Sequence, residues 1–291
     1  MYSLKIIVLS LFIALAIFPA NSYGEEWEAS VPPVKKYLFK FYPKIFFTSA
    51  FFSEEGKALN LPKVTGLLYI VAPVHVQYGY TKSLAFGAVL PIGLTYQEII
   101  PTLRPDPITR FTVREIWLTV QHRWWTVPFI SSSSIRIKIP LASKKDWEDG
   151  LRIGDNQIDI YPIYYFSYFS KNRYWYTDTS IGYKYRFKKD NIKPFDEYNF
   201  RSLLGYELIP DFQLRFFLFA DLTAFRNGDF DSISPAKIQF FQNEGSLHTF
   251  GYGLSMWLRP ETRLEISTAG DWSGRNQYRG MKWSIGIVKI I

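Results

Sequence analysis

Cysteine is absent from the 291-residue chain. A secreted scaffold held together by disulfides is therefore excluded, and so are thiolate metal sites and cysteine nucleophiles. The chain also lacks a phosphate-binding glycine loop, a zinc-protease helix motif and a dinucleotide fingerprint. After residue 24 there is no run of about 18 apolar residues, which excludes a bundle of membrane-spanning helices.

Aromatic residues, in contrast, are plentiful and make up 19% of the chain. They favour β-strands and also gather at membrane–water boundaries. The mean hydropathy is −0.06 and the formal net charge is +8. Because the Lys and Arg residues are dispersed along the chain instead of clustered, we expect them in a lumen and in loops, and we expect no nucleic-acid partner.

The amino terminus has the layout of a secretory signal peptide. Lys5 precedes an apolar run over 6–18, and Pro19 ends this run before a small-residue cleavage site. The run is too short to span a bilayer, so a retained anchor is disfavoured. We predict a cleaved signal peptide over 1–24 and a mature chain of 25–291, exported from the cytoplasm.

The segment TDTSIGYKYRF, residues 177–187, alternates between apolar and polar side chains without interruption. Ile181 and Tyr185 share one face, whereas Asp178 and Lys184 share the other. A period of two indicates a β-strand with one apolar and one polar face. The apolar face must contact either a second protein layer or lipid.

Twelve segments have this strand character, and each is about as long as a tilted strand that crosses a bilayer. They are 36–48, 67–79, 83–97, 111–123, 133–141, 157–169, 174–187, 198–209, 212–224, 247–257, 263–272 and 280–291.

Short and long connections alternate along the chain, which is the loop asymmetry of outer-membrane barrels. The short ones are rich in Gly, Pro, Asn or Asp and cover 79–82, 170–173, 209–211 and 259–262. The long ones cover 49–66, 98–110, 142–156, 188–197 and 225–246. Two connections depart from this rule: 124–132 is long for a periplasmic turn, and 273–279 is short for an outer loop.

These patterns predict an all-β fold: one closed, antiparallel, up-and-down transmembrane β-barrel of about twelve strands over 25–291, in the outer membrane of a Gram-negative bacterium. Tryptophans near strand ends are expected in the interfacial belt: Trp175, Trp257, Trp272 and Trp283. Prolines inside the predicted strands each remove a ladder donor and leave the local registers open: Pro43, Pro73, Pro91, Pro140 and Pro162.

Two stretches resemble the outer-membrane family labelled for the MetA-pathway of phenol degradation. VQYGYTKSLAFGAVLPIGLTYQ, residues 76–97, has the family's Tyr-Gly turn, alternating strand and Leu-Pro. GRNQYRGMKWSIGIVKII, residues 274–291, is similar to its final hairpin, although Ile291 stands where barrels often end in an aromatic residue. The resemblance implies a barrel channel grouped with transporters of small, often aromatic or hydrophobic molecules.

The polar faces of the strands predict a charged lumen that passes small solutes passively, with a slight preference for anions. The candidate lining residues are Lys40, Lys44, His75, Glu115, Arg136, Lys138, Asp159, Tyr161, Tyr176, Asp178, Lys184, Arg186, Arg201, Glu207, Arg215, Asp221, Arg263, Glu265 and Asp271. Tyrosines that could stack flat solutes are Tyr42, Tyr69, Tyr161, Tyr165, Tyr174 and Tyr176. We expect no catalysis, cofactor or metal, and as partners only membrane lipid, the barrel assembly machinery and the solute.

Two alternatives stay open. Ser246 and His248 share a strand face near the predicted outer rim, so a barrel hydrolase acting on membrane lipid is one of them. The other is an exported soluble β-sandwich or adhesin, in which the apolar faces pack against each other. The acid-rich stretches 155–159 and 227–231 have calcium-like spacing but lack the closing Glu, so we expect them to be solvated loops.

Overall fold

The computed structural model describes residues 29–60, 67–97, 108–113, 115–141, 157–170, 174–188, 192–209, 213–230, 245–275 and 277–291. The predicted signal peptide at 1–24 and the acid-rich stretch 155–159, except for its last three residues, lie outside these ranges. Within the described residues no helix is long and apolar enough to cross a membrane.

Antiparallel strands make up almost all of the regular structure in the described part of the chain. They are β1 (Tyr37–Phe41), β2 (Lys44–Phe52), β3 (Ala58–Asn60), β4 (Leu67–Gly79), β5 (Leu84–Gln97), β6 (Ile108–Val113), β7 (Glu115–Trp125), β8 (Ile130–Pro140), β9 (Asp159–Phe169), β10 (Trp175–Arg186), β11 (Ile192–Lys193), β12 (Asp196–Ile209), β13 (Leu214–Arg226), β14 (Asp229–Phe230), β15 (Gly245–Arg259), β16 (Thr262–Arg275) and β17 (Gln277–Ile290).

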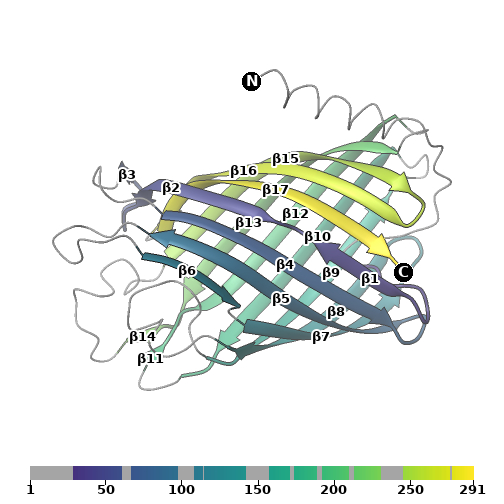
Figure 1. Ribbon diagram of the computed structural model, residues 1–291, viewed down its shortest axis with the longest axis horizontal. Coiled ribbons are helices and arrows are strands. Elements are labelled where there is room, and N and C mark those ends of the chain that lie inside the picture. The colour runs from purple at the N-terminus through teal and green to yellow at the C-terminus, as the bar shows by residue number, and fades with distance from the viewer. Residues whose placement is uncertain are drawn as a thin grey trace.

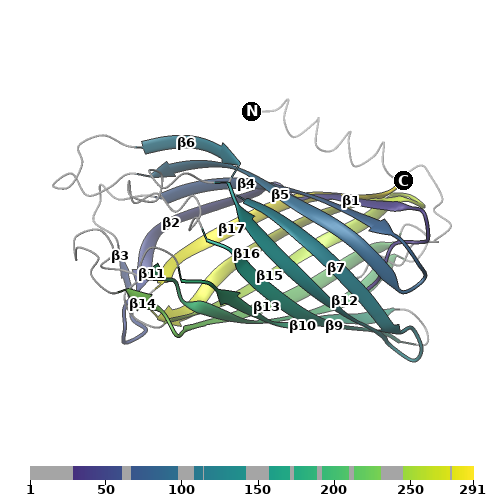
Figure 2. The same ribbon diagram turned by 90° about the horizontal axis from the view of Figure 1, so that it is seen from below.

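One sheet closes on itself to form a barrel (Figures 1 and 2). Neighbouring strands pair in chain order from β4 round to β17, and β17 then pairs with β1 and β2, which in turn pair with β4. β1 and β2 keep one register with both neighbours across Tyr42–Pro43, so they are two halves of one wall strand. β6 and β7 together make a second divided strand against β5.

The wall therefore has twelve strands, and the predicted closed antiparallel barrel is confirmed. The soluble β-sandwich alternative is wrong, because the sheet has no second layer to pack against. Closure follows from the chemistry of the backbone: in a bilayer every N–H and C=O needs a partner, and a closed sheet leaves no unpaired edge.

The two ends of the barrel carry different connections. At one end the strands are separated in the chain by only two to five residues, over 80–83, 126–129, 170–174, 210–213 and 260–261. The C-terminus and the start of β1 lie at this end, whereas β3, β6, β11 and β14 lie at the other (Figure 1). The predicted exception at 124–132 is wrong, because β7 extends to Trp125 and β8 begins at Ile130. The predicted short connection near 273–279 is even shorter, since β16 and β17 leave only residue 276 between them.

The two prolines of β4 and β5 lie where the ladder between these two strands does not need their missing N–H groups. Pro73 of β4 and Pro91 of β5 stand directly opposite each other. The carbonyl of Pro73 accepts a bond from the Tyr42 N–H at 3.3 Å, so the ring nitrogen of Pro73 also points toward β1 and away from Pro91. Pro43 sits between β1 and β2, and its carbonyl accepts from Ile285 N–H at 3.2 Å. The barrel registers therefore continue through these positions.

The other two prolines disturb the wall equally little. Pro140 is the last residue of β8, where no further ladder bond is required. Pro162 lies inside β9 opposite Ile135 of β8. On the other side of β9, the pairing with β10 is interrupted between Ile163 and Ile160 without a change of register.

The exterior of the barrel is apolar, and many of the side chains that point inward are buried. Along β8, Ile135, Ile137 and Ile139 are 54%, 41% and 41% exposed. On the last strand Ile285 is 55% exposed whereas Val288, on the opposite face, is completely buried. Soluble monomers rarely expose an apolar surface that continues around the whole molecule. The exterior is therefore the face that lipid covers, and the fold is that of a transmembrane barrel.

Three of the four predicted belt tryptophans face outward: Trp175, Trp272 and Trp283 are 43–63% exposed. Trp257 is the exception, since it is only 7% exposed and the Arg263 guanidinium lies 6.0 Å from its ring centre. Its prediction as a belt residue is wrong because it shares the inward face of β15 with Ser255 and Thr249. At the short-turn end, Trp124 and Trp125 supply exposed indoles that the sequence analysis did not select.

A positive charge placed on the apolar exterior tests whether lipid covers that face. Ile135→Arg places a guanidinium at mid-strand on the lipid face, where we expect a loss of about 2–4 kcal/mol in the free energy of unfolding. Ile158→Arg is the matched control, because Ile158 is 51% exposed but lies just before β9 at the rim. Urea titration of tryptophan fluorescence in phospholipid vesicles measures both. Equal losses for the two variants would contradict a bilayer around β8.

Candidate functional site: the barrel lumen

The first described residues of the chain lie inside the barrel at the short-turn end. Ala29, Ser30 and Val31 are 0%, 4% and 5% exposed. Gln121 of β7 holds this segment: its amide nitrogen donates to the Ser30 carbonyl at 3.4 Å and to the Ser132 hydroxyl at 2.9 Å. The chain then reaches the wall at Val34, which bridges to Gly79. The segment 29–32 therefore fills part of the lumen cross-section.

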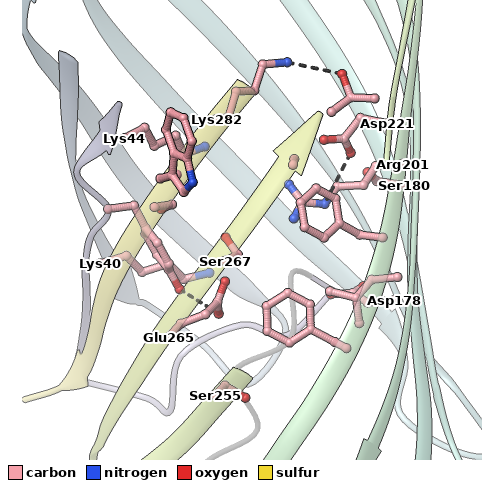
Figure 3. Close-up of a pocket in the computed structure, with 18 of the residues that line it drawn as sticks. Lys40, Lys44, Asp178, Ser180, Arg201, Asp221, Ser255, Glu265, Ser267 and Lys282 are labelled. Carbon is pink, nitrogen blue, oxygen red and sulfur yellow. Dashed lines mark hydrogen bonds and ion pairs between the residues drawn. The ribbon is translucent and has the colours of Figure 1, made fainter. Parts of the chain in front are cut away.

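A cavity of about 200 Å³ remains inside the wall formed by β1, β2, β10, β12, β13 and β15–β17. Figure 3 shows its polar side chains converging from both sides of the lumen. Eight of the candidate lining residues surround it: Lys40, Lys44, Tyr176, Asp178, Arg201, Asp221, Arg263 and Glu265. The structure thus brings together residues that are far apart in the sequence.

The charged groups of this cavity form wide ion pairs that differ in exposure. Arg201 Nε lies 3.6 Å from Asp221 Oδ1, and both side chains keep more than a third of their surface exposed (Figure 3). An exposed pair of this kind contributes little to stability. Arg263 lies 3.6 Å from Glu265, to which the Tyr42 hydroxyl donates at 3.5 Å, and these two side chains are only 10% and 20% exposed. A solute in the cavity can therefore reach the charges of Arg201 and Asp221 more easily than those of the second pair.

Lys282 of β17 is a cavity residue that the sequence analysis missed. Its Nζ lies 3.0 Å from Asp271 Oδ1 and 3.2 Å from the Thr249 hydroxyl. Asp271 also accepts bonds from the Thr249 hydroxyl at 2.5 Å and the Gly280 N–H at 3.0 Å. The alternation of the last strand could have identified this residue: Trp283 and Ile285 face outward, so Lys282, next to Trp283 in the chain, faces inward.

A second, drier cluster lies on the wall formed by β8, β9, β10 and β12. Lys138 and Asp159 form a 2.6 Å ion pair with only 3% and 1% of their side chains exposed. Lys184 Nζ lies 2.6 Å from Glu197 Oε2, and Arg186 also contacts Glu197. Four of these five residues were candidates. Glu197 was missed because the analysis placed residue 197 in a loop, whereas β12 begins at Asp196.

Ring contacts and hydrogen bonds extend this cluster along the wall. Lys184 Nζ lies 5.6 Å from the ring centres of both Trp117 and Tyr161, and the Trp117 indole donates to Glu115 Oε1 at 2.7 Å. Arg136 donates to the Tyr165 hydroxyl at 2.7 Å. These candidates therefore pack against each other on one side of the lumen and do not reach the cavity.

The remaining candidates lie in other places. Glu207 and Arg215 form a 3.7 Å pair between β12 and β13. His75 of β4 stands opposite Lys40 of β1 in the register. Tyr174 is 41% exposed just before β10. The side chain of Tyr69 lies outside the described part of the structure.

Inward glycines let the aromatic rings of the cavity lie flat against the wall. A Cβ atom at Gly205 would overlap the ring of Tyr176, which occupies the space above that glycine. The same holds for three further pairs of the cavity wall: Gly253 with Phe217, Gly251 with Phe219 and Gly286 with Tyr42. Rings that lie along the wall occupy less of the lumen cross-section than rings that project across it.

The proposed lipid-hydrolase pair is not assembled. His248 Nδ1 lies 2.7 Å from the Ser273 hydroxyl of β16, not from Ser246, and its ring lies 5.7 Å from the exposed indole of Trp272. Among the described residues no carboxylate bonds to His248, so a third group that orients the imidazole is missing there. No group of three His, Asp or Glu is placed to hold a metal ion within the described ranges.

These observations define the class of fold: a closed, twelve-stranded transmembrane β-barrel with a charged lumen. No family model matches the chain, and no curated protein is similar enough to match it. Among solved structures it is similar to an outer membrane channel from Pseudomonas putida F1, with a TM-score of 0.73 and 13% identity over 92% of this chain and 100% of that chain.

Two other barrels are similar at a lower level. For the NanC porin the TM-score is 0.49, with 9% identity over 85% of this chain and 98% of that chain. For the CymD monoaromatic hydrocarbon channel it is 0.44, with 9% identity over 88% of this chain and 89% of that chain. The similarity to the Pseudomonas putida channel, at 13% identity, supports the fold alone, so the function has to be argued from the lumen.

The dry and wet ion pairs should respond differently to the same chemical change. Asp159→Asn removes the carboxylate that lies 2.6 Å from buried Lys138, and we expect a loss of about 3 kcal/mol or more in the free energy of unfolding. Asp221→Asn removes the partner of exposed Arg201 and should cost less than about 1 kcal/mol. Urea unfolding in vesicles compares them, and the reverse order would contradict the assigned burial.

The contact between Gly205 and Tyr176 gives a third prediction. Gly205→Ala forces the Tyr176 ring away from the wall, which should cost about 1–3 kcal/mol of stability and narrow the lumen. Gly270→Ala is the control, because nothing lies within 4 Å of its added Cβ, and alanine should stabilise that strand slightly. Vesicle unfolding and single-channel conductance measure both effects; a Gly205→Ala protein as stable as Gly270→Ala would overturn the flat-ring packing.

Proposed function

We propose that this protein is an outer-membrane channel that gives small polar or aromatic solutes passive passage, assisted by binding in the lumen. The observation that supports this best is the contrast between the two surfaces of one wall. The exterior is apolar, and the interior combines a cavity of about 200 Å³ with charged side chains, among them the exposed pair Arg201–Asp221. A barrel that served only as an anchor would not need solvated charges inside it.

The proposed location is the outer membrane of a Gram-negative bacterium, with the short turns in the periplasm. Loop asymmetry supports this orientation, since barrels of this class have short periplasmic turns and longer outer loops. The signal peptide expected at 1–24 would carry the chain across the inner membrane, and the barrel assembly machinery would insert it. The similar fold of the Pseudomonas putida channel is consistent with this location.

The size of the lumen supports small solutes. Twelve strands enclose a narrow bore once side chains fill it, and the buried segment 29–32 narrows the short-turn end further. The aromatic side chains of the wall favour solutes with a flat or apolar part, as the resemblance to the MetA-pathway family also suggests. That narrower family assignment stays a prediction, because no family model matches the chain.

Electrical recording combined with solute flux tests the proposal. The purified full chain, folded in detergent, should migrate anomalously on an unheated gel, produce discrete conductance steps in planar bilayers and let small solutes enter vesicles. Folded barrel that inserts into vesicles but leaves them impermeable to salt and to small solutes would rule the channel out.

His248→Ala separates the channel from the lipid hydrolase. It removes the imidazole that bonds Ser273 on the outside of the wall, so solute flux should be unchanged within error. Phospholipid hydrolysis, measured as fatty-acid release, should be absent from both the unmutated protein and the variant. Release that depends on His248 would show that the barrel is an enzyme.

A further inference from the structure

The cavity carries more positive than negative charge. Five Lys or Arg side chains line it against three Asp or Glu side chains. Asp271 bonds Lys282 from the adjacent strand and lowers the excess to one positive charge. A narrow space with a positive excess and low-dielectric walls concentrates anions.

Lys40 is the cation that accounts for this excess. Arg201, Arg263 and Lys282 each have a carboxylate at 3.0–3.6 Å. For Lys40, no carboxylate lies within ion-pair distance in the part of the chain that the structure describes. Lys44 follows on the same inward face, and both lysines lie across the cavity from Asp178 and Asp221 in Figure 3. An incoming anion would therefore meet a lysine whose charge is not already neutralised.

The cavity also has an apolar patch. Leu203 of β12, Phe217 and Phe219 of β13, and Ala269 of β16 line it. Phe217 and Phe219 lie against Gly253 and Gly251 and are only 2% and 8% exposed, so the partly exposed Leu203 offers most of the apolar contact. A fully hydrated inorganic anion could not use this surface, whereas a compact hydrocarbon group gains about 25 cal/mol for each Å² of apolar area that it buries.

The volume limits the size of the occupant. A cavity of about 200 Å³ holds roughly seven water molecules at about 30 Å³ each. Sites for drug-sized ligands are larger, at about 300–1,000 Å³. One small ring or short branched chain with a single acidic group fits this space.

We propose that this cavity is a binding subsite for small monocarboxylates with a compact apolar body. The carboxylate contacts Lys40 and Lys44, and the body lies against Leu203, Phe217 and Phe219. The inference rests on the proposed channel function and names its solute class. The wet pair Arg201–Asp221 keeps the lumen beside the subsite hydrated, so a bound solute can leave again.

The concentration at which solute flux saturates measures how tightly the subsite binds each solute. Vesicles containing the full chain, in about 0.1 M salt so that charges act over about 10 Å, are tested with four probes: cyclohexanecarboxylate, benzoate, acetate and neutral benzamide. Cyclohexanecarboxylate and benzoate should saturate at concentrations at least tenfold below those for acetate and for benzamide. The two ring acids should be similar, because an apolar body is required and aromaticity is not.

Charge and apolar contact can be removed separately. Lys40→Gln should raise the half-saturation concentration of cyclohexanecarboxylate about tenfold, whereas Lys40→Arg, which keeps the charge, should raise it less than threefold. Leu203→Ser should reduce the preference for cyclohexanecarboxylate over acetate about threefold or more. Lys36→Gln is the matched control, since Lys36 is exposed outside the cavity before β1, and it should leave all four probes unchanged.

The outcomes separate this inference from the function on which it rests. If unmutated protein conducts salt but passes benzamide as readily as benzoate, the subsite is wrong and the channel stands. The same conclusion follows if Lys40→Gln, shown to be folded by its anomalous gel migration, leaves every half-saturation concentration unchanged. If Lys40→Gln fails to fold, Lys44→Gln and Leu203→Ser replace it: unchanged half-saturation concentrations in both variants would show that the subsite is wrong. If the unmutated barrel passes neither salt nor solutes, the channel itself is wrong.

Discussion

Closure of the backbone hydrogen-bond ladder is the constraint on which the rest of this structure depends. A sheet surrounded by hydrocarbon cannot leave N–H or C=O groups unpaired, so β17 must return to β1 and β2. Closure tilts the strands, as Figure 1 shows, and fixes which residues face inward. The alternation of apolar and polar residues in the sequence is the consequence. Each strand presents hydrocarbon to lipid and reserves its other face for the lumen.

The ladder also explains how the wall tolerates prolines. Pro73 and Pro91 oppose each other with their ring nitrogens pointing away from their common ladder, so the pairing of β4 with β5 loses no bond. The missing donors face the divided strands on either side, β1/β2 and β6/β7. Each absent bond costs about 1 kcal/mol, which is small beside the many bonds that remain along strands of 13 and 14 residues. Register is consequently kept where the sequence alone left it open.

The sequence predicted most of the wall because a period of two is a strong signal over a strand of bilayer length. All twelve segments, the parity of their faces and most of the loop lengths followed from it. Predictions failed where a strand boundary was misplaced, or where the face on which a residue lies differs from the location that its residue type suggests. Trp257 has the composition of a belt residue but the inward phase of β15. Glu197 lies beyond a boundary that was drawn two residues too late.

The contents of the lumen were harder to predict, for a different physical reason. The alternation of polar and apolar residues predicts which residues face inward. It does not predict which of them meet across the barrel, because that depends on the tilt and the stagger of twelve strands. Lys138 and Asp159 proved to be a dry pair, and Arg201 and Asp221 a wet one, although the four look alike in the sequence. The burial of 29–31 carries no sequence signal, because a short irregular segment has no period.

The difference between the dry and wet pairs also determines where a solute can travel. Beside Lys138–Asp159 a solute would have to break a 2.6 Å pair from which water is already excluded, and a separated buried pair is costly. Beside Arg201–Asp221 it replaces water around groups that are 3.6 Å apart and more than a third exposed. In the proposed channel, the path of least free energy therefore passes the cavity beside Arg201 and Asp221. The adjacent wall of β8 and β9, with its buried ion pair, lies outside that path.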